Sequence, residues 1–263
     1  MDTKRKLENR VALVTGGGGA IGGASAKLMA AEGASILVAD VRLEAAEEIA
    51  HEIEVSGGQA KPIYLDVAEP EQVSEVVSKA EKYFGSLNIL LNVAAAVTPD
   101  APVEKLSLSE WNRAFTVNLT GPFLMAKYAI PYMRAAGGGV IVNMASQLGT
   151  IGVPNRSAYC STKSALIHMT TILAAEVACD NIRVNSISPG VIETPRTLRR
   201  FEGTEQFQAA RGPLHMLGRV GKPEEVAKAV LFLASEDSSF TTATDLLVDG
   251  GYIYLKRSGD RGT

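Results

Sequence analysis

Two kinds of apolar pattern alternate along the 263-residue chain. Short, almost unbroken runs of β-branched and aliphatic residues are typical of strands that are buried on both faces of a parallel sheet. These runs predict strands over residues 11–15, 35–40, 61–66, 87–92, 139–144, 183–188 and 245–249. Between the runs, apolar residues recur at helical spacing, which predicts helices over residues 21–32, 43–55, 70–84, 108–134, 158–178 and 223–235.

This alternation predicts an α/β protein. Right-handed crossovers place such strands in one twisted sheet with helices on both faces. We therefore expect a three-layer Rossmann fold with a doubly wound, seven-stranded parallel sheet. No linker or repeat divides residues 1–263, so we expect a single domain with its core over residues 10–251. Residues 189–221 are predicted to form an irregular lid, because long loops in compact domains are usually functional; residues 256–263 form a polar tail.

Composition and charge remove several classes of function. The net charge is −3, which gives no basic footprint for nucleic acid or an anionic membrane. A membrane-spanning helix needs about 18 consecutive apolar residues, and no stretch approaches that length. The basic start of the chain lacks the apolar segment of a signal peptide. Cys160 and Cys179 have no neighbouring ligands at metal spacing, so the sequence indicates neither a disulfide scaffold nor a metal site. We expect a cytoplasmic protein.

A glycine-rich segment follows the first predicted strand and opens the first predicted helix. It covers residues 15–23 and holds six of the 25 glycines. Such glycines let the backbone approach a pyrophosphate, whose charge meets the free N–H groups of the helix N-terminus. Asp40 ends the second predicted strand, 18 residues beyond Gly22, where a carboxylate can accept hydrogen bonds from ribose hydroxyls. Together these features predict a dinucleotide site.

Asp40 also bears on the choice of nucleotide. Its carboxylate would repel a 2′-phosphate, and the loop positions Gly18 and Gly19 offer no cation to hold one. The sequence therefore favours NAD over NADP. Arg42, two residues beyond Asp40, keeps NADP open as the alternative.

A tyrosine and a lysine lie four residues apart in the helix predicted over residues 158–178. Tyr159 and Lys163 share one helical face, and a nearby ammonium favours the phenolate, which lowers the tyrosine pKa from its ordinary value of about 10. The pair can therefore supply a general acid or base. Ser146 follows the strand predicted over residues 139–144. It is expected to face the same crevice, at the carboxyl ends of the strands, and to hold a substrate oxygen.

Several motifs in a fixed order carry a family resemblance. They are the loop over residues 15–22, Asp66-Val67, Asn118, Ser146, the Tyr159/Lys163 pair, Pro189-Gly190 with Thr194, and Asp249-Gly250-Gly251. With these motifs, residues 10–251 resemble the short-chain dehydrogenase/reductase (SDR) family. The resemblance implies an NAD(P)-dependent oxidoreductase that transfers a hydride between a nicotinamide cofactor and a small-molecule secondary alcohol or ketone. It also implies a homotetramer.

The resemblance implies a role for each matching residue. Tyr159 is the implied general acid/base, Ser146 orients the substrate oxygen, and Lys163 and Asn118 support the proton relay. The implied cofactor-binding residues are Gly16, Gly18, Gly19, Ile21, Gly22, Asp40, Asp66, Val67, Asn92, Ala94, Tyr159, Lys163, Pro189, Ile192 and Thr194. A helix N-cap is the alternative role for Asp66.

The family pattern is not fully kept. Ala20 replaces the middle glycine of the nucleotide loop, and Ala243 replaces a glycine before the last strand. After the fourth strand, Asn-Val-Ala-Ala stands where Asn-Asn-Ala-Gly is usual, with Val93 at the second position. Alanine tolerates most glycine conformations except a positive φ, so we expect Ala20 to be harmless. At Val93 we expect a difference in packing or stability, with cofactor binding retained.

The sequence leaves the substrate open. The candidate substrate residues are Ser146, Gln147, Arg156 and Arg196. Arginines suit a carboxylate or phosphate on the substrate, although such side chains more often form a solvated face or pair with acidic neighbours. Gln147 suits a polyol or sugar alcohol equally well.

Three other functions stay as alternatives. The first is an NADP-preferring carbonyl reductase of the same family. A Rossmann methyltransferase is the second, since it also uses a glycine loop and an acidic residue, but it does not need the set of Ser146, Tyr159 and Lys163. A non-catalytic nucleotide-binding Rossmann protein is the third, since a fold does not fix a function.

Overall fold

Seven parallel strands form one sheet in the order β3-β2-β1-β4-β5-β6-β7. The computed structural model describes residues 5–255, so the predicted tail over residues 256–263 lies outside the described residues. The strands are β1 Val11–Thr15, β2 Ser35–Asp40, β3 Gln59–Tyr64, β4 Ile89–Asn92, β5 Gly139–Met144, β6 Ile182–Pro189 and β7 Asp245–Val248. The predicted doubly wound Rossmann sheet is confirmed.

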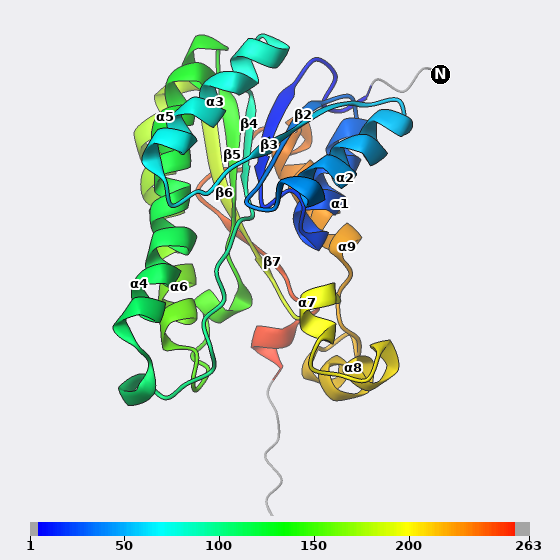
Figure 1. Ribbon diagram of the computed structural model, residues 1–263, viewed down its shortest axis with the longest axis vertical. Helices are drawn as coiled ribbons and strands as arrows, with labels where there is room; N and C mark the ends of the chain where they lie inside the picture. Colours follow the sequence, from blue (N-terminus) through cyan, green and yellow to red (C-terminus); the bar gives the residue numbers. More distant parts are fainter. Residues whose placement is uncertain (1–4, 256–263) are drawn as a thin grey trace, which may run out of the picture.

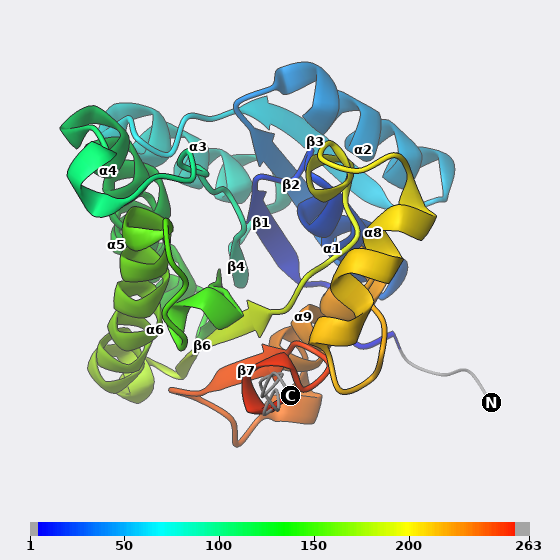
Figure 2. The same ribbon diagram turned by 90° about the horizontal axis from the view of Figure 1, so that it is seen from below.

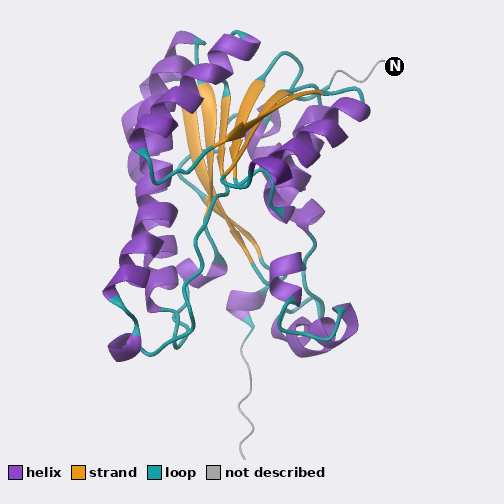
Figure 3. Cartoon of the chain, viewed as in Figure 1, coloured by secondary structure: helices purple, strands orange, loops and turns teal. Residues whose placement is uncertain are grey.

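Helices cover both faces of this sheet (Figure 1, Figure 3). One face carries α1 Ala20–Ala31, α2 Leu43–Val55 and α9 Pro223–Ala234. The other carries α3 Pro70–Phe84, α4 Leu108–Phe115, α5 Gly121–Ala135 and α6 Ser157–Val177. The three predicted layers are therefore present.

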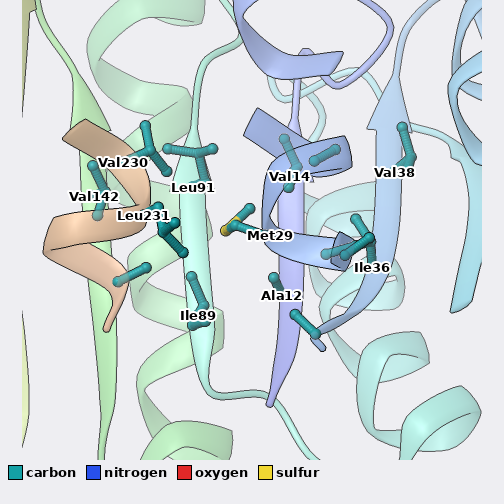
Figure 4. Close-up of a cluster of buried hydrophobic side chains, with 14 of the residues drawn as sticks. Ala12, Val14, Met29, Ile36, Val38, Ile89, Leu91, Val142, Val230 and Leu231 are labelled. Atoms are coloured by element: carbon teal, nitrogen blue, oxygen red, sulfur yellow. The ribbon is translucent and has the colours of Figure 1, made fainter. Parts of the chain in front are cut away.

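Two hydrophobic clusters fill the spaces between the layers. Because successive strand residues point to opposite faces, the neighbours Leu13 and Val14 of β1 belong to different clusters. Val14 packs in the cluster that holds Met29 of α1 and Val230 of α9 (Figure 4). Each fully buried side chain of this size contributes about 1.5–3 kcal/mol to folding. Val93 packs against the same cluster, which gives its side chain an apolar role.

The helix predicted over residues 108–134 is interrupted. A π-helical turn over Thr116–Thr120 joins α4 to α5, and Asn118 lies inside it. Pro122 follows in the first turn of α5. Since proline has no N–H, it offers no hydrogen bond to the carbonyl group of Asn118 four residues earlier. Single π-turns inside helices are frequent at functional sites, and this one lies beside the predicted catalytic residues.

The predicted lid over residues 189–221 is less irregular than expected. It contains α7 Pro195–Leu198, α8 Thr204–Arg211 and a 3₁₀ turn over Gly212–Leu214. Thr194 begins α7 with a capping box, in which Thr197 takes the place of the glutamate or glutamine usual at that position. The prediction of an irregular segment was therefore wrong. The pair of Thr194 and Thr197 is a weaker sequence signal for the start of a helix than a threonine followed by a glutamate or glutamine. Figure 1 shows α7 and α8 below the sheet, on the side of α9.

Ala243, the alanine that replaces a family glycine, has a φ of 58°. This left-handed conformation costs a residue with a Cβ about 1–2 kcal/mol, and glycine would return about 0.4–1 kcal/mol through the entropy of the unfolded chain. Ala243→Gly is therefore expected to raise the free energy of unfolding by about 0.5–1 kcal/mol. Urea denaturation measures the change.

Ala209→Gly is the matched control for this substitution. Ala209 is an exposed residue within α8, where glycine costs about 1 kcal/mol relative to alanine. Equal destabilisation by the two substitutions would contradict the expectation. Ala20, by contrast, has no positive φ, so its replacement of a glycine adds no backbone strain of this kind.

Candidate active site

The predicted catalytic side chains come from three elements at the carboxyl ends of the strands. Ser146 lies two residues after β5, Tyr159 and Lys163 lie in the first turns of α6, and Asn118 lies in the π-turn between α4 and α5. Figure 2 looks onto this edge of the sheet, with α4, α5 and α6 on one side and α8 of the lid on the other. The fold therefore brings the four residues to one place.

The hydroxyl groups of Tyr159 and Ser146 are hydrogen-bonded to each other. Burial raises the pKa of the Tyr159 phenol above its ordinary value, while the guanidinium of Arg196, the hydrogen bond with Ser146 and the charge of Arg156 lower it. Ser146 Oγ also accepts a hydrogen bond from the backbone N–H of Leu148 at 3.1 Å. The backbone thus holds the Ser146 hydroxyl, and the charges of two arginines act on the Tyr159 phenol.

Lys163 is buried beneath this pair. Its Nζ donates a hydrogen bond to the carbonyl oxygen of Met144 at 2.6 Å and lies 5.7 Å from the centre of the Tyr159 ring. Burial, assisted by the charge of Arg196, lowers the pKa of Lys163 to about 7. The expectation that Lys163 lowers the Tyr159 pKa was therefore wrong for the protein alone: burial raises this pKa, and the cations that oppose the rise are Arg196 and Arg156.

Asn118 is fully buried, and its side chain makes three hydrogen bonds. Its Oδ1 accepts from the backbone N–H of Ala96 at 2.7 Å, and its Nδ2 donates to the carbonyl oxygen of Ala96 at 2.9 Å and to Thr162 Oγ1 at 3.2 Å. Thr162 in turn donates to the carbonyl oxygen of Tyr159. The side chain of Asn118 thus ties the π-turn to α6, and both N–H groups of its Nδ2 are used within the protein.

A chain of buried amides and a hydroxyl links two strands to α6. Asn92 Nδ2 donates to Asn143 Oδ1, and Asn143 Nδ2 donates to Thr170 Oγ1, each at 2.9 Å. Asn143 and Thr170 were not among the predicted site residues. The sequence signal for Asn143 was a polar residue inside the apolar run of β5, which the apolar pattern predicts only as part of a strand. Asn92 Oδ1 has no partner among residues 5–255.

The glycine loop packs too tightly for side chains. A Cβ on Gly16, whose φ is 66°, would lie 2.7 Å from the backbone nitrogen of Ala94, and one on Gly18 would lie 2.6 Å from Ala45 Cβ. The N-cap of α1 is Gly19, which has no side chain to occupy the N–H groups of the first turn, and that turn holds no acidic residue. Its N–H groups, including those of Ile21 and Gly22, therefore suit a pyrophosphate. The loop fits the phosphate part of a dinucleotide.

Asp40 occupies the end of β2 beside this loop. Its two carboxylate oxygens accept hydrogen bonds from the backbone N–H groups of Gly18 at 3.0 Å and Arg42 at 2.9 Å. The Arg42 guanidinium lies 3.7 Å from the same carboxylate and is mostly exposed. Each carboxylate oxygen keeps a further lone pair for a ribose hydroxyl. The geometry fits a ribose next to Asp40.

The remaining predicted cofactor residues lie around the same edge. Asp66 Oδ1 accepts from the N–H of Ala68 at 2.9 Å, whereas Glu69 is the N-cap of α3, so the alternative N-cap role of Asp66 was wrong. Val67 is buried in the hydrophobic cluster of that face. The strand predicted over residues 61–66 ends at Tyr64 instead, which leaves Asp66 and Val67 in the turn that follows it.

The base of the lid is anchored to the end of β6. Pro189 ends that strand, and Ile192 is buried and pairs with Gly221 in a parallel bridge. Thr194 is the N-cap of α7, and its side chain accepts a hydrogen bond from the backbone N–H of Thr197. These contacts anchor α7, and the charge of its residue Arg196 lowers the pKa values of Tyr159 and Lys163.

Comparison with known proteins agrees with this geometry. A family model described as enoyl-(acyl carrier protein) reductase matches residues 18–253. The solved structure of a short-chain type dehydrogenase/reductase from Mycobacterium marinum superposes with a TM-score of 0.88 at 36% sequence identity, over 95% of this chain and 97% of that one.

Two dehydrogenases show comparable similarity. A cyclohexanol dehydrogenase from Acinetobacter sp. (strain SE19) is 42% identical over 94% of this chain and 96% of its own length. A cis-4-hydroxycyclohexanecarboxylate dehydrogenase from Sinomonas cyclohexanicum is 39% identical over 92% of this chain and 96% of its own length. The chain belongs to the short-chain dehydrogenase/reductase family.

Family membership confirms the resemblance inferred from the motifs and identifies this SDR protein as an oxidoreductase. It removes the methyltransferase alternative. Within residues 5–255, no helix is both long and apolar enough to span a membrane.

An ion-pair bridge that joins the segment before α4, the segment before α6 and the lid of this SDR protein was not predicted. Asp100, in the loop between β4 and α4, contacts Arg156 at 2.8 Å and Arg200 of the lid at 2.9 Å. Arg156 was a candidate substrate residue, but its guanidinium is already paired. Sequence reasoning weighed only nearby acidic residues as partners for the lid arginines, and Asp100 lies 100 positions before Arg200.

Gln147 places an unsatisfied polar atom beside Ser146. The side chain is 4% exposed, and its Oε1 has no hydrogen-bond partner among the described residues. An unpaired buried acceptor costs about 1–3 kcal/mol. Gln147→Met, of similar size, is therefore expected to raise the melting temperature by about 2–4 °C, the shift that corresponds to about 1 kcal/mol in a chain of this length. Differential scanning calorimetry tests this.

Gln72→Met is the control for that substitution. Gln72 Oε1 accepts a hydrogen bond from the N–H of Asp66 at 3.1 Å, so its loss is expected to destabilise the protein. A lower melting temperature in Gln147→Met would show that the Gln147 amide is satisfied in solution.

Proposed function

We propose that this protein oxidises small secondary alcohols to ketones with NAD, and catalyses the reverse reduction. The hydrogen-bonded pair of Tyr159 and Ser146, with the buried amino group of Lys163 5.7 Å from the centre of the Tyr159 ring, is the observation that carries the proposal. A proton acceptor and an oxygen-binding hydroxyl, side by side, can remove a hydroxyl proton.

Each residue has a distinct task in the oxidative direction. Ser146 holds the substrate hydroxyl, and the Tyr159 phenolate takes its proton. A bound nicotinamide would supply the acceptor for the hydride of the carbinol carbon, so that the alcohol would become a ketone. Lys163 stabilises the phenolate, and Asn118 supports the relay that carries the proton away.

The proposed cofactor is NAD. The support is the position of Asp40, whose buried carboxylate lies next to the glycine loop and would repel a 2′-phosphate. Arg42 stays the feature that favours the second candidate, an NADP-preferring carbonyl reductase. Its guanidinium is mostly exposed and donates at 3.3 Å to the carbonyl of Gly18, within the same loop.

A matrix of two cofactors and several alcohols tests the proposal. NAD or NADP is incubated with cyclohexanol, cis-4-hydroxycyclohexanecarboxylate or D-threitol, and the absorbance of the reduced nicotinamide is followed. The first two alcohols are chosen after the similar dehydrogenases, and D-threitol after a D-threitol dehydrogenase that is 37% identical. Turnover with NAD is expected. Calorimetric binding of NAD without turnover of any alcohol or ketone would favour the non-catalytic alternative.

We also propose that the protein is a homotetramer. Large apolar side chains are exposed on two separate surfaces, one on α4, α5 and α6 and one around α9 and β7. Leu108, Phe123 and Ile172 lie on the first surface, and Phe232 and Phe240 lie on the second. Sedimentation is expected to give a species of about four times the 27.8 kDa of one chain. A monomer at assay concentration would contradict this.

A further inference from the structure

We propose that Asp100 is a positioning residue of the reaction: its carboxylate holds the lid closed through Arg200, and opening of this ion pair admits the alcohol and releases the ketone. This inference rests on the proposed function, since it assigns to the lid the retention of the substrate. It follows from how few polar contacts hold the lid, from the exposure of those contacts and from the order of the strands.

The outer part of the lid, residues 193–214, has a single polar attachment to the body of the protein. Its other hydrogen bonds stay within the lid. Among residues 5–255, only one hydrogen-bonded ion pair joins this segment to a residue outside the lid, and it links Arg200 Nη1 to Asp100 Oδ2 at 2.9 Å. Loss of this pair therefore leaves the outer lid without a polar contact to the body of the protein.

The Asp100 carboxylate itself is held by the segment that begins α6. Arg156, the N-cap residue of α6, contacts Oδ1 through Nε at 2.8 Å and donates a hydrogen bond to Oδ2 through Nη2 at 3.1 Å. Such two-nitrogen contacts are the strong form of a guanidinium–carboxylate pair. The backbone N–H of Ala101 also donates to the carbonyl oxygen of Asn155 at 3.1 Å. Asp100 is therefore anchored to its neighbouring loop, and the lid is the part that can move away from it.

The ion pair of the lid joins the two connections that flank the strand leading to Ser146. Asp100 lies in the connection that follows β4, and the lid follows β6. In the sheet, β5 lies between these two strands, and Ser146 is two residues beyond the end of β5. Arg156, which anchors Asp100, lies three residues before Tyr159. The Asp100–Arg200 pair is therefore placed where a closed lid would retain an alcohol.

The exposure of the Asp100–Arg200 pair makes it easy to open. The two side chains are 35% and 61% exposed, so water and salt reach them, and a pair of this kind stabilises the closed lid only weakly. The side chain of Arg156 is 23% exposed, and its two-nitrogen contact is screened less. The pair with Arg200 is consequently the first of the two to open, and such opening steps let substrates enter and products leave.

Kinetics with an uncharged alcohol test the proposal. With cyclohexanol and saturating NAD, Arg200→Gln is expected to raise KM about two- to fivefold, the range of an exposed ion pair, and to change kcat by less than about twofold. Asp100→Asn is expected to raise KM at least as far. Added salt is expected to raise KM for the unmodified protein toward the value for Arg200→Gln and to leave that variant unchanged, because salt screens the pair. Arg200→Lys, which keeps the charge, is expected to keep the salt response.

Arg199→Gln is the matched control. Arg199 is the exposed residue next to Arg200, and its side chain forms no ion pair within the described part of the chain. The variant removes one charge from the lid but leaves the pair with Asp100, so KM and its salt response are expected to stay as in the unmodified protein. Equal rises in KM for Arg199→Gln and Arg200→Gln would show that the charge of the lid acts without the pair, which would overturn the inference.

Hydrogen exchange separates this inference from the proposed function, because it needs no alcohol and no turnover. Amide exchange of residues 193–214, followed by mass spectrometry, is expected to be faster in Arg200→Gln than in the unmodified protein or in Arg199→Gln. This result would support the role of the ion pair even if no alcohol were oxidised. Equal exchange in all three proteins would overturn the inference even if cyclohexanol were a good substrate.

Discussion

Tyr159→Phe is expected to lower kcat for alcohol oxidation by about 10²- to 10⁴-fold, the contribution of a positioned general acid or base. The substitution removes only the hydroxyl that is hydrogen-bonded to Ser146, so the ring still packs in α6. NAD affinity, measured by calorimetry, is expected to change little. An active Tyr159→Phe variant would refute the mechanism.

The pH profile gives a second test of Tyr159. Burial raises its pKa, and neighbouring cations lower it, but oxidation requires the phenolate in either case. Below the apparent pKa, kcat/KM for oxidation is therefore expected to rise about tenfold per pH unit, and ketone reduction is expected to fall above it. Tyr128→Phe, on the other helix α5, is a control that is expected to keep both profiles.

Asp40→Ser is expected to lower kcat/KM with NAD by about 10- to 100-fold, because a hydrogen bond to a charged group contributes about 1.5–3 kcal/mol. The value with NADP is expected to rise, since the repelling charge is removed while Arg42 remains. Steady-state kinetics with both cofactors at one alcohol concentration measure the change.

Asp40 also holds the backbone of the glycine loop, and this second role needs a control. Its carboxylate accepts hydrogen bonds from Gly18 and Arg42, so the variant loses loop contacts as well as charge. The melting temperature without nucleotide reports this loosening. Equal losses with NAD and NADP would show that Asp40 acts on the loop and does not discriminate between the cofactors.

Local patterns in the sequence were enough to predict the order of the elements and the edge of the sheet that carries the site. The runs of buried strands and the glycine loop report on neighbouring residues, so periodicity and spacing detect them. The Asp100 bridge and the hydrogen bonds of Asn118 join residues that are far apart in the chain, and no local pattern marks such pairs.

The π-turn shows a second limit of sequence reasoning. Residues 108–134 keep helical spacing throughout, so periodicity predicts one helix. The residue that periodicity overlooks is Pro122, because it has no N–H for the regular hydrogen bond of a continuous α-helix. The directions in which the pKa values of Tyr159 and Lys163 shift could not be predicted from the sequence either. Burial is the largest cause of both shifts, and burial depends on the whole fold.

The buried link from Asn92 through Asn143 to Thr170 governs the rotation of α6 about its own axis. Thr170 lies 11 residues after Tyr159 and seven after Lys163, spacings that return to the same side of a helix. Through its hydroxyl group, Thr170 thus hydrogen-bonds to β5 the same face of α6 that carries Tyr159. A hydrogen bond three turns away therefore restricts the rotation of α6, and with it the angle at which Tyr159 faces Ser146.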